Sequence, residues 1–397
     1  MWVKGVLGCV VLALLCAPVA VSAREVSVGY TSPAALHGLD VVTRVDSLHV
    51  AEVSTSDIAA LRLRTGILWV RATVQRHHLG QTFVASPRGI AAAEWQFDAT
   101  RSNLVPQSVE QAAAGLTIAV VDTGADVAAP AIAAKAPITH NAVTGNPTVS
   151  DATGHGTFVA SLAAGSVTNG SALSGFGGDA KLMIVQANRG ANAFDDVDEA
   201  AGITWAVDNG AKIINLSIGG AETSQVERDA IQYAISHGVL LVIAGGNSGQ
   251  SGNVPSYPAA LVGTHGLAVA SSTATGKRAA FSTVAPYVSL AAPGVHVLGA
   301  TTSVASTSVY PRAKFTGQPG LYAYGSGTSY SAPQVSGAAA LVWAADPSLT
   351  PDGVAQILEQ TATGGGSWNG KTGYGVLDVA AAVARALGLA ASPANNP

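Results

Sequence analysis

The sequence is poor in cysteine and in charged residues. Only two of its 397 residues are cysteines, Cys9 and Cys16, and both lie in the first apolar stretch. A catalytic thiol and a disulfide framework are therefore excluded for the rest of the chain. Charged residues make up 11% of the chain and the net charge is −4, whereas about 25% of residues are charged in typical soluble domains. Because no basic patch or tail is present, we expect no nucleic-acid partner.

Long hydrophobic runs are also missing, with the exception of the N-terminus. Lys4 is followed by an apolar run from Gly5 to about Pro18, and the small residue Ala23 comes soon after it. A charged residue, an apolar segment and then a small residue at the cleavage site, in this order, predict a secretory signal peptide over residues 1–23. The run is too short, and too broken by Pro18, for a stable membrane anchor. We therefore expect a secreted protein, either extracellular or periplasmic.

Beyond this segment the chain alternates between strand and helix patterns. Helical periodicity and apolar runs follow one another with glycine-rich turns between them, as is typical of an α/β fold with a mostly parallel central sheet and helices on both faces. The expected strands are 116–121, 181–186, 212–217, 239–244 and 267–270. The expected helices are 157–164, 196–208, 223–236, 332–344 and 351–361.

Three segments place reactive side chains at the ends of these elements. Asp122 ends an apolar strand, His155 lies between two glycines at a helix start, and Ser329 follows a glycine turn before an apolar helix. A carboxylate can orient a histidine, a histidine can carry a proton, and a helix N-terminus favours a developing anion. Each segment alone also fits an ordinary turn or helix cap.

Taken together, the motifs Asp122-Thr123-Gly124, Gly154-His155-Gly156-Thr157 and Gly327-Thr328-Ser329-Tyr330-Ser331-Ala332-Pro333, in that order, resemble those of the subtilisin-like serine proteases. The resemblance covers roughly residues 94–388. It implies an Asp122–His155–Ser329 triad that hydrolyses peptide bonds through an acyl-enzyme intermediate. It also implies that Asn247 donates to the oxyanion, and that the chemistry needs no cofactor.

The resemblance further implies a substrate groove. Ser217, Ile218 and Gly219 would pair with an extended peptide, and Ala244, Gly245 and Gly246 would form the facing wall of a pocket. Small residues on both walls and no evident charge at the base predict a wide apolar slot. We therefore expect protein or peptide substrates, cut with broad specificity and a preference for a large apolar residue just before the cut (P1).

Residues 24–90 form a distinct segment ahead of the expected catalytic domain at 91–397. A strand pattern at 49–53, a helical pattern at 58–64 and a second strand pattern at 67–74 predict a β–α–β unit, half of a small α+β ferredoxin-like domain. This segment resembles the inhibitory propeptide of many subtilisin-like proteases, with the boundary between residues 79 and 94. The alternative is a small N-terminal domain that the mature enzyme keeps.

Some segments of the sequence are also compatible with other functions. Asp195, Asp196, Asp198 and Glu199 are compatible with a calcium loop, but an acidic first helical turn is favoured; structural calcium stays an open possibility. Residues 365–372 match the P-loop pattern, but they follow a helix and do not open one. In lipases and esterases the nucleophilic serine lies in a Gly-x-Ser-x-Gly turn. The segment around Ser329 lacks the second glycine of that pattern. A catalytically inactive relative acting as a binding module is the non-enzyme alternative.

Overall fold

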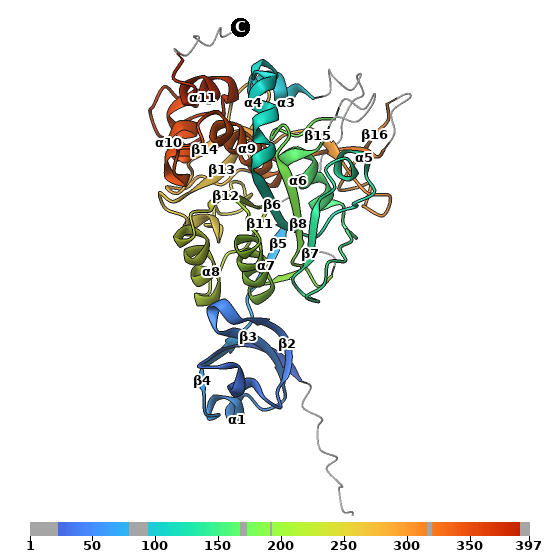
Figure 1. The fold of residues 1–397 in the computed structure, drawn as a ribbon, viewed down its shortest axis with the longest axis vertical. Helices are drawn as coiled ribbons and strands as arrows, with labels where there is room; N and C mark the ends of the chain where they lie inside the picture. Colours follow the sequence, from blue (N-terminus) through green and yellow to red (C-terminus); the bar gives the residue numbers. More distant parts are fainter. Residues whose placement is uncertain (1–22, 79–93, 167–172, 191–192, 316–319, 390–397) are drawn as a thin grey trace, which may run out of the picture.

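The computed structural model describes residues 23–78, 94–166, 173–190, 193–315 and 320–389. These form a small N-terminal unit and a larger main unit, joined by strand β5 (Gln75–His78) (Figure 1). Residues 1–22 of the expected signal peptide lie outside the described residues, as does the expected processing loop at 79–93. Within the described residues, no helix is both long enough and apolar enough to cross a bilayer.

The main unit is built on a seven-stranded sheet. Neighbouring strands in the order β14-β13-β12-β10-β6-β8-β7 all pair in parallel. All five expected strands are present, because each is an apolar run that the sheet buries on both faces. Their bounds, with those of the two edge strands β7 and β14 that the sequence did not predict, are β6 (Thr117–Asp122), β7 (Ile138–Asn141), β8 (Lys181–Gln186), β10 (Ile213–Leu216), β12 (Leu240–Ala244), β13 (Gly266–Ser272) and β14 (Leu290–Pro293).

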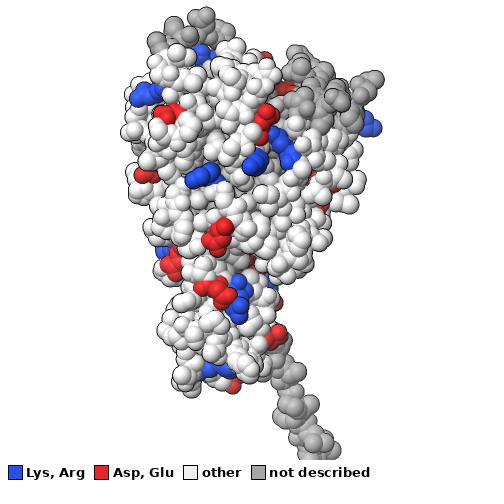
Figure 2. Space-filling view, viewed as in Figure 1, with Lys and Arg blue, Asp and Glu red and all other residues white. Residues whose placement is uncertain are grey.

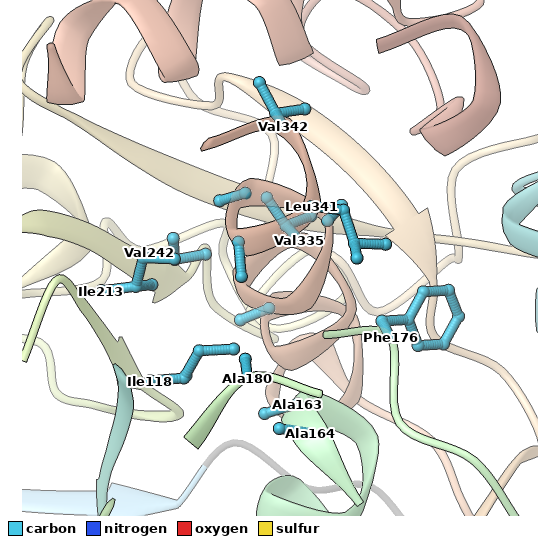
Figure 3. Packing of buried hydrophobic residues seen from close by; sticks show 14 of the residues in the cluster. Ile118, Ala163, Ala164, Phe176, Ala180, Ile213, Val242, Val335, Leu341 and Val342 are labelled. Carbon is cyan, nitrogen blue, oxygen red and sulfur yellow. The ribbon is translucent and has the colours of Figure 1, made fainter. Parts of the chain in front are cut away.

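Helices cover both faces of this sheet, as the alternation predicted. On one face α7 (Asp196–Asp208) and α8 (Gln225–Ser236) enclose one apolar core. The other face carries α4 (Gln107–Ala112), α6 (His155–Ala164), α9 (Thr328–Ala345), α10 (Pro351–Thr361) and α11 (Val379–Ala386). Helix α9 is buried along nearly its whole length. Figure 3 shows its side chains Val335 and Leu341 among residues of the sheet and of the loop that carries Phe176.

Smaller elements complete the main unit. A three-stranded antiparallel sheet in the order β15-β17-β16 packs beside α6. The bounds are β15 (Val297–Ala300), β16 (Arg312–Ala313), β17 (Tyr322–Gly325), α3 (Trp95–Ala99) and α5 (Pro130–Ala133).

The N-terminal unit is a four-stranded antiparallel sheet with α1 (Ile58–Arg62) packed on it. The strand order is β2-β3-β1-β4, with bounds β1 (Arg24–Tyr30), β2 (Asp40–Val45), β3 (Val50–Thr55) and β4 (Ile67–Ala72). The two expected strands, β3 and β4, are not neighbours, because β1 pairs with both of them. This split β–α–β arrangement confirms the ferredoxin-like expectation.

The N-terminal unit docks on the helices α7 and α8. Val45 and Val50 are buried in the same core as these helices, and Leu48 and Trp69 pack against it. Figure 2 shows how thinly charged side chains are spread over the face in view, and several of them lie where the two units meet. The docking surface therefore combines an apolar centre with charged contacts.

Candidate active site

The expected site residues meet at the carboxyl end of the parallel sheet. Asp122 ends β6, Ser217 follows β10, and Asn247 comes three residues after β12. His155 and Ser329 lie in the first turns of α6 and α9, which pack against each other. Because parallel strands end at a common edge, five segments that are distant in sequence present side chains to one place.

Asp122 and His155 form a buried pair. Neither side chain is exposed, and Asp122 Oδ1 lies 2.7 Å from His155 Nδ1. The same oxygen accepts the backbone N–H of Thr123 at 2.7 Å. A carboxylate can only accept here, so Nδ1 carries the proton and Nε2 is the basic nitrogen of the neutral ring.

Asp151 holds the turn that carries His155. Its Oδ1 accepts the N–H of Gly154 at 2.8 Å, and its Oδ2 accepts the N–H and the hydroxyl of Thr157 at 2.8 and 2.6 Å. Asp151 thereby satisfies donors at the open N-terminus of α6. No role was predicted for Asp151, although it lies only four residues before His155 in the sequence.

The glycine after His155 is required by a close approach of two backbones. A Cβ at Gly156 would lie 2.1 Å from the carbonyl oxygen of Gly124. Any side chain there would force the histidine turn away from Asp122. The Gly-His-Gly sequence is thus explained by packing between two loops.

Ser329 is tied to the neighbouring strand end. Its Oγ donates to the carbonyl of Ser217 at 2.8 Å, and the Oγ of Ser217 donates to the carbonyl of Ser329 at 2.9 Å. The ring of the next residue, Tyr330, lies 5.8 Å from the ring of His155. The structure therefore brings Ser329, Ser217 and His155 into one site.

Asn247 is oriented by the residue before Ser329. Its Oδ1 accepts the backbone N–H and the hydroxyl of Thr328, at 3.1 and 3.0 Å. With the oxygen fixed in this way, the amide N–H₂ group faces the opposite side. Thr328 is a second positioning residue to which the sequence analysis gave no role.

A pocket of about 280 Å³ opens beside Asn247. Its lining carries no charged side chain and consists of Gly219, Gly220, Ala221, Gly246, Asn247, Ser248, Ser251, Val254, Pro255 and Ser256. Gly219 and Gly246 thus lie in the walls of this pocket. Gly245 lies behind them, with its N–H donated to Val269 at 2.8 Å, and Ala244 is the buried end of β12.

The expected substrate strand already has a partner from the chain itself. Strand β11 (Ile218–Gly219) pairs antiparallel with β5, so that Ile218 faces His78 and Gly219 faces His77. On its other side β5 pairs with β9 (Phe194–Asp195). The chain therefore places its own segment as the middle strand of a three-stranded sheet, beside Ser329.

The acidic residues around α7 bind arginines. Asp196, Asp198 and Glu199 lie in the first turn of the helix, as predicted. Within the described ranges, one acidic group has metal-like spacing, and it consists of Glu25, Glu52 and Asp195. Arg189 is ion-paired with all three, so a guanidinium already neutralises this set.

The chain resembles known proteases in sequence and in structure. A sequence model of the subtilase family matches residues 113–375. Thermitase from Thermoactinomyces vulgaris is 33% identical over 250 residues, which cover 62% of this chain and 81% of the relative. An alkaline protease from Alkalihalobacillus alcalophilus is 33% identical over 319 residues, covering 80% of this chain and 74% of the relative.

The crystal structure of fervidolysin from Fervidobacterium pennivorans, a keratinolytic enzyme, superimposes with a TM-score of 0.76 at 25% identity. The match covers 94% of this chain and 62% of that one. Family, fold and site geometry agree with one another. This chain belongs to the subtilase family and is a subtilisin-like serine endopeptidase.

Proposed function

We propose that Asp122, His155 and Ser329 act as the catalytic triad of this endopeptidase. The observation that carries the assignment is the buried 2.7 Å contact between Asp122 and His155 Nδ1, in a site shared with Ser329. Nε2 of His155 takes the proton of the Ser329 hydroxyl while Oγ attacks the peptide carbonyl carbon. The C–N bond then breaks, and the leaving amine receives that proton. Water, activated by the same histidine, hydrolyses the resulting ester.

The oxyanion of each tetrahedral intermediate is stabilised by Asn247 and by the backbone N–H of Ser329 at the start of α9. The Thr328 donors support the role of Asn247, because they hold its oxygen away from the reacting carbonyl. In a dry site such pre-oriented donors contribute strongly, and loss of one costs about 100- to 1000-fold in rate.

The apolar pocket beside Asn247 supports a preference for a large apolar residue at P1. Its glycine walls leave width for a branched or aromatic side chain, and its lining offers no carboxylate to a lysine or arginine. We expect proteins with exposed, extended segments to be the substrates.

We further propose that the N-terminal unit is an inhibitory propeptide of a secreted enzyme. Its strand β5 fills the groove between β9 and β11 in the manner of a substrate. Ion pairs reinforce the docking, because Arg71 of β4 contacts Asp196 and Glu52 of β3 contacts Arg189. While β5 stays in place, no other peptide can pair with β11.

A fluorophosphonate probe tests the triad, since it labels only an activated serine. We expect labelling of the processed wild-type protein and none of Ser329→Ala. Hydrolysis of casein should follow the same pattern. If the wild type reacted with neither reagent, the protein would be the inactive relative and the proposed triad would be wrong.

A further inference from the structure

Strand β5 buries one arginine completely in the main unit. The side chain of Arg76 lies between the carboxylates of Glu199 on α7 and Glu227 on α8, and none of the three is exposed. Nε of Arg76 donates to Glu227 Oε1 at 2.7 Å, and Nη2 lies 2.7 Å from the same oxygen. Nε is also 3.4 Å from Glu199 Oε2. A buried guanidinium needs such partners, because its desolvation is costly.

The acidic pocket is part of the main unit, and residues of that unit hold Glu227 in place. Glu227 Oε2 accepts the hydroxyl of Thr223 at 2.7 Å, and the backbone N–H of Glu227 is capped by Ser224 Oγ at 3.1 Å. Gly220 lies against β5, where a Cβ would be in ordinary contact with Arg76 Nη1 at 3.4 Å and in tight contact with the Gln75 carbonyl oxygen at 3.1 Å.

The charge of Glu199 depends on its ion pair with Arg76. Both oxygens of Glu199 are buried, and with Arg76 in place no described residue donates a hydrogen bond to them. Burial, followed by the neighbouring Glu227, raises the pKa of Glu199 well above its usual range. Two adjacent buried carboxylates therefore gain most from a group with a delocalised positive charge and several donors.

The strand register locates this pocket relative to the bond that is cut. Ile218 faces His78 and Gly219 faces His77, so a bound peptide that keeps this register would place its next residue toward the C-terminus opposite Ser217. Ser217 is the residue whose carbonyl accepts the Ser329 hydroxyl. The peptide residue facing it is therefore P1, and counting back makes Arg76 the fourth residue before the cut, P4.

We propose that Glu199 and Glu227 form a subsite that selects arginine at P4 of protein substrates. This inference rests on the proposed role of Ser329 and adds a second specificity determinant to the apolar P1 pocket. Arg76 of the N-terminal unit is then the first occupant of a site that later substrates use. Lysine fits less well, because its single ammonium group cannot present a planar fork to both carboxylates.

Two internally quenched peptides test the subsite with the processed enzyme made from the full chain. One has the sequence of residues 74–82, and the other carries citrulline, a neutral analogue of arginine, at position 76. We expect kcat/KM to be at least about tenfold higher for the arginine peptide, because a site built for a charged donor rejects an analogue that lacks the charge. Mass spectrometry should place the cut three residues after the arginine.

Charge removal in the pocket should abolish this preference. In Glu199→Gln/Glu227→Gln we expect the ratio of the two kcat/KM values to fall to about one, with cleavage of the citrulline peptide retained. Glu222→Gln is the matched control, because Glu222 is exposed in the loop before α8, and it should keep the wild-type ratio. If the double variant fails to mature, the ratio of the two kcat/KM values is measured for Glu227→Gln alone and compared with the wild-type ratio.

Equal cleavage of both peptides by the wild type would overturn the subsite while leaving the protease assignment intact. Retention of the arginine preference in the double variant would overturn it as well. Failure of the wild type to cleave either peptide or casein would instead show that the proposed catalytic function is wrong, and the subsite would fall with it.

Discussion

Thr328 donates both its backbone N–H and its hydroxyl to the side-chain oxygen of Asn247. Its Oγ1 also accepts the N–H of Gly246 at 3.3 Å, which ties the turn after β12 to the start of α9. The residue before the proposed nucleophile thereby sets the orientation of the proposed oxyanion donor. Two loops that approach from different strands are locked to each other at the point where the charge would develop.

We predict that Thr328→Val lowers kcat about tenfold with little change in KM, because one of the two described hydrogen bonds from Thr328 to Asn247 is lost. Thr328→Ser keeps the hydroxyl and should restore most of the activity. Asn247→Ala should cost about 100- to 1000-fold. Steady-state kinetics on a P1-leucine peptide measure all three variants. An unchanged kcat in Thr328→Val would contradict the positioning role.

Replacement of Asp151 should destabilise the protein. In Asp151→Asn an amide N–H₂ group replaces one of two oxygens that accept buried donors, so the free energy of unfolding should fall by about 2 kcal/mol or more. Urea denaturation in a Ser329→Ala background, which prevents self-digestion, gives the measurement. Asp126→Asn is the control, because the Asp126 side chain accepts only the Ala128 N–H among the bonds described. Similar losses in both variants would argue against the special role of Asp151.

The sequence predicted the parts of the fold that local pattern determines. Helix α7 and strand β8 have the expected bounds, because apolar periodicity and the turns around them are local properties. The meeting of Asp122 with His155 was predictable only through the motif order, since 33 residues separate them. The positioning roles of Asp151 and Thr328 were missed, because they depend on loop contacts that no periodicity encodes.

Ion pairs and strand pairs between residues far apart in the chain could not be predicted from the sequence either. The acidic first turn of α7 was correctly placed, but its arginine partners come from the N-terminal unit and from Arg189. Nothing local in residues 75–78 indicates that this short strand inserts between β9 and β11. Strand β1 was also missed, although it is one of the two inner strands of the N-terminal sheet.

Processing should begin the mature chain at Gly80. Extended by one residue beyond His78, the register of β5 with β11 would bring Leu79 to P1, and the apolar side chain of Leu79 suits the uncharged pocket. N-terminal sequencing of the secreted protein measures the start. The Ser329→Ala protein should remain uncut at this bond, and a wild-type protein that begins at Arg24 would refute processing.

The buried carboxyl of Glu94 should make stability depend on pH. Burial raises its pKa from 4.5 to about 8. Because the folded state holds this proton more tightly than the unfolded state, its contribution is fully present below about pH 4.5 and is lost as the pH rises toward 8. We expect Glu94→Gln to remove a slope of up to about 1.4 kcal/mol per pH unit.

The free energy of unfolding is measured across this pH range for the Ser329→Ala protein with and without the Glu94→Gln substitution. Comparison of the two profiles gives the part of the slope that is due to Glu94. The amide oxygen introduced by Glu94→Gln can still accept the Ser174 N–H, which lies 3.3 Å from Glu94 Oε1. The substitution therefore removes the titrating group and keeps its hydrogen bond. Parallel pH profiles for the two proteins would contradict the buried, protonated state of Glu94.

The position of β5 between β9 and β11 also limits the shape of what the enzyme can cut. Neighbouring strands lie about 4.8 Å apart, so removal of the middle strand leaves a slot roughly 10 Å wide between two unpaired edges. An α-helix with its side chains is about 10–12 Å across, and its backbone groups are already paired. Only a chain stretched to a single strand can enter and bond to both edges. Folded helices and sheets in a target protein would thus be protected until they open locally, and the sites of attack would follow the flexibility of the target as well as its sequence.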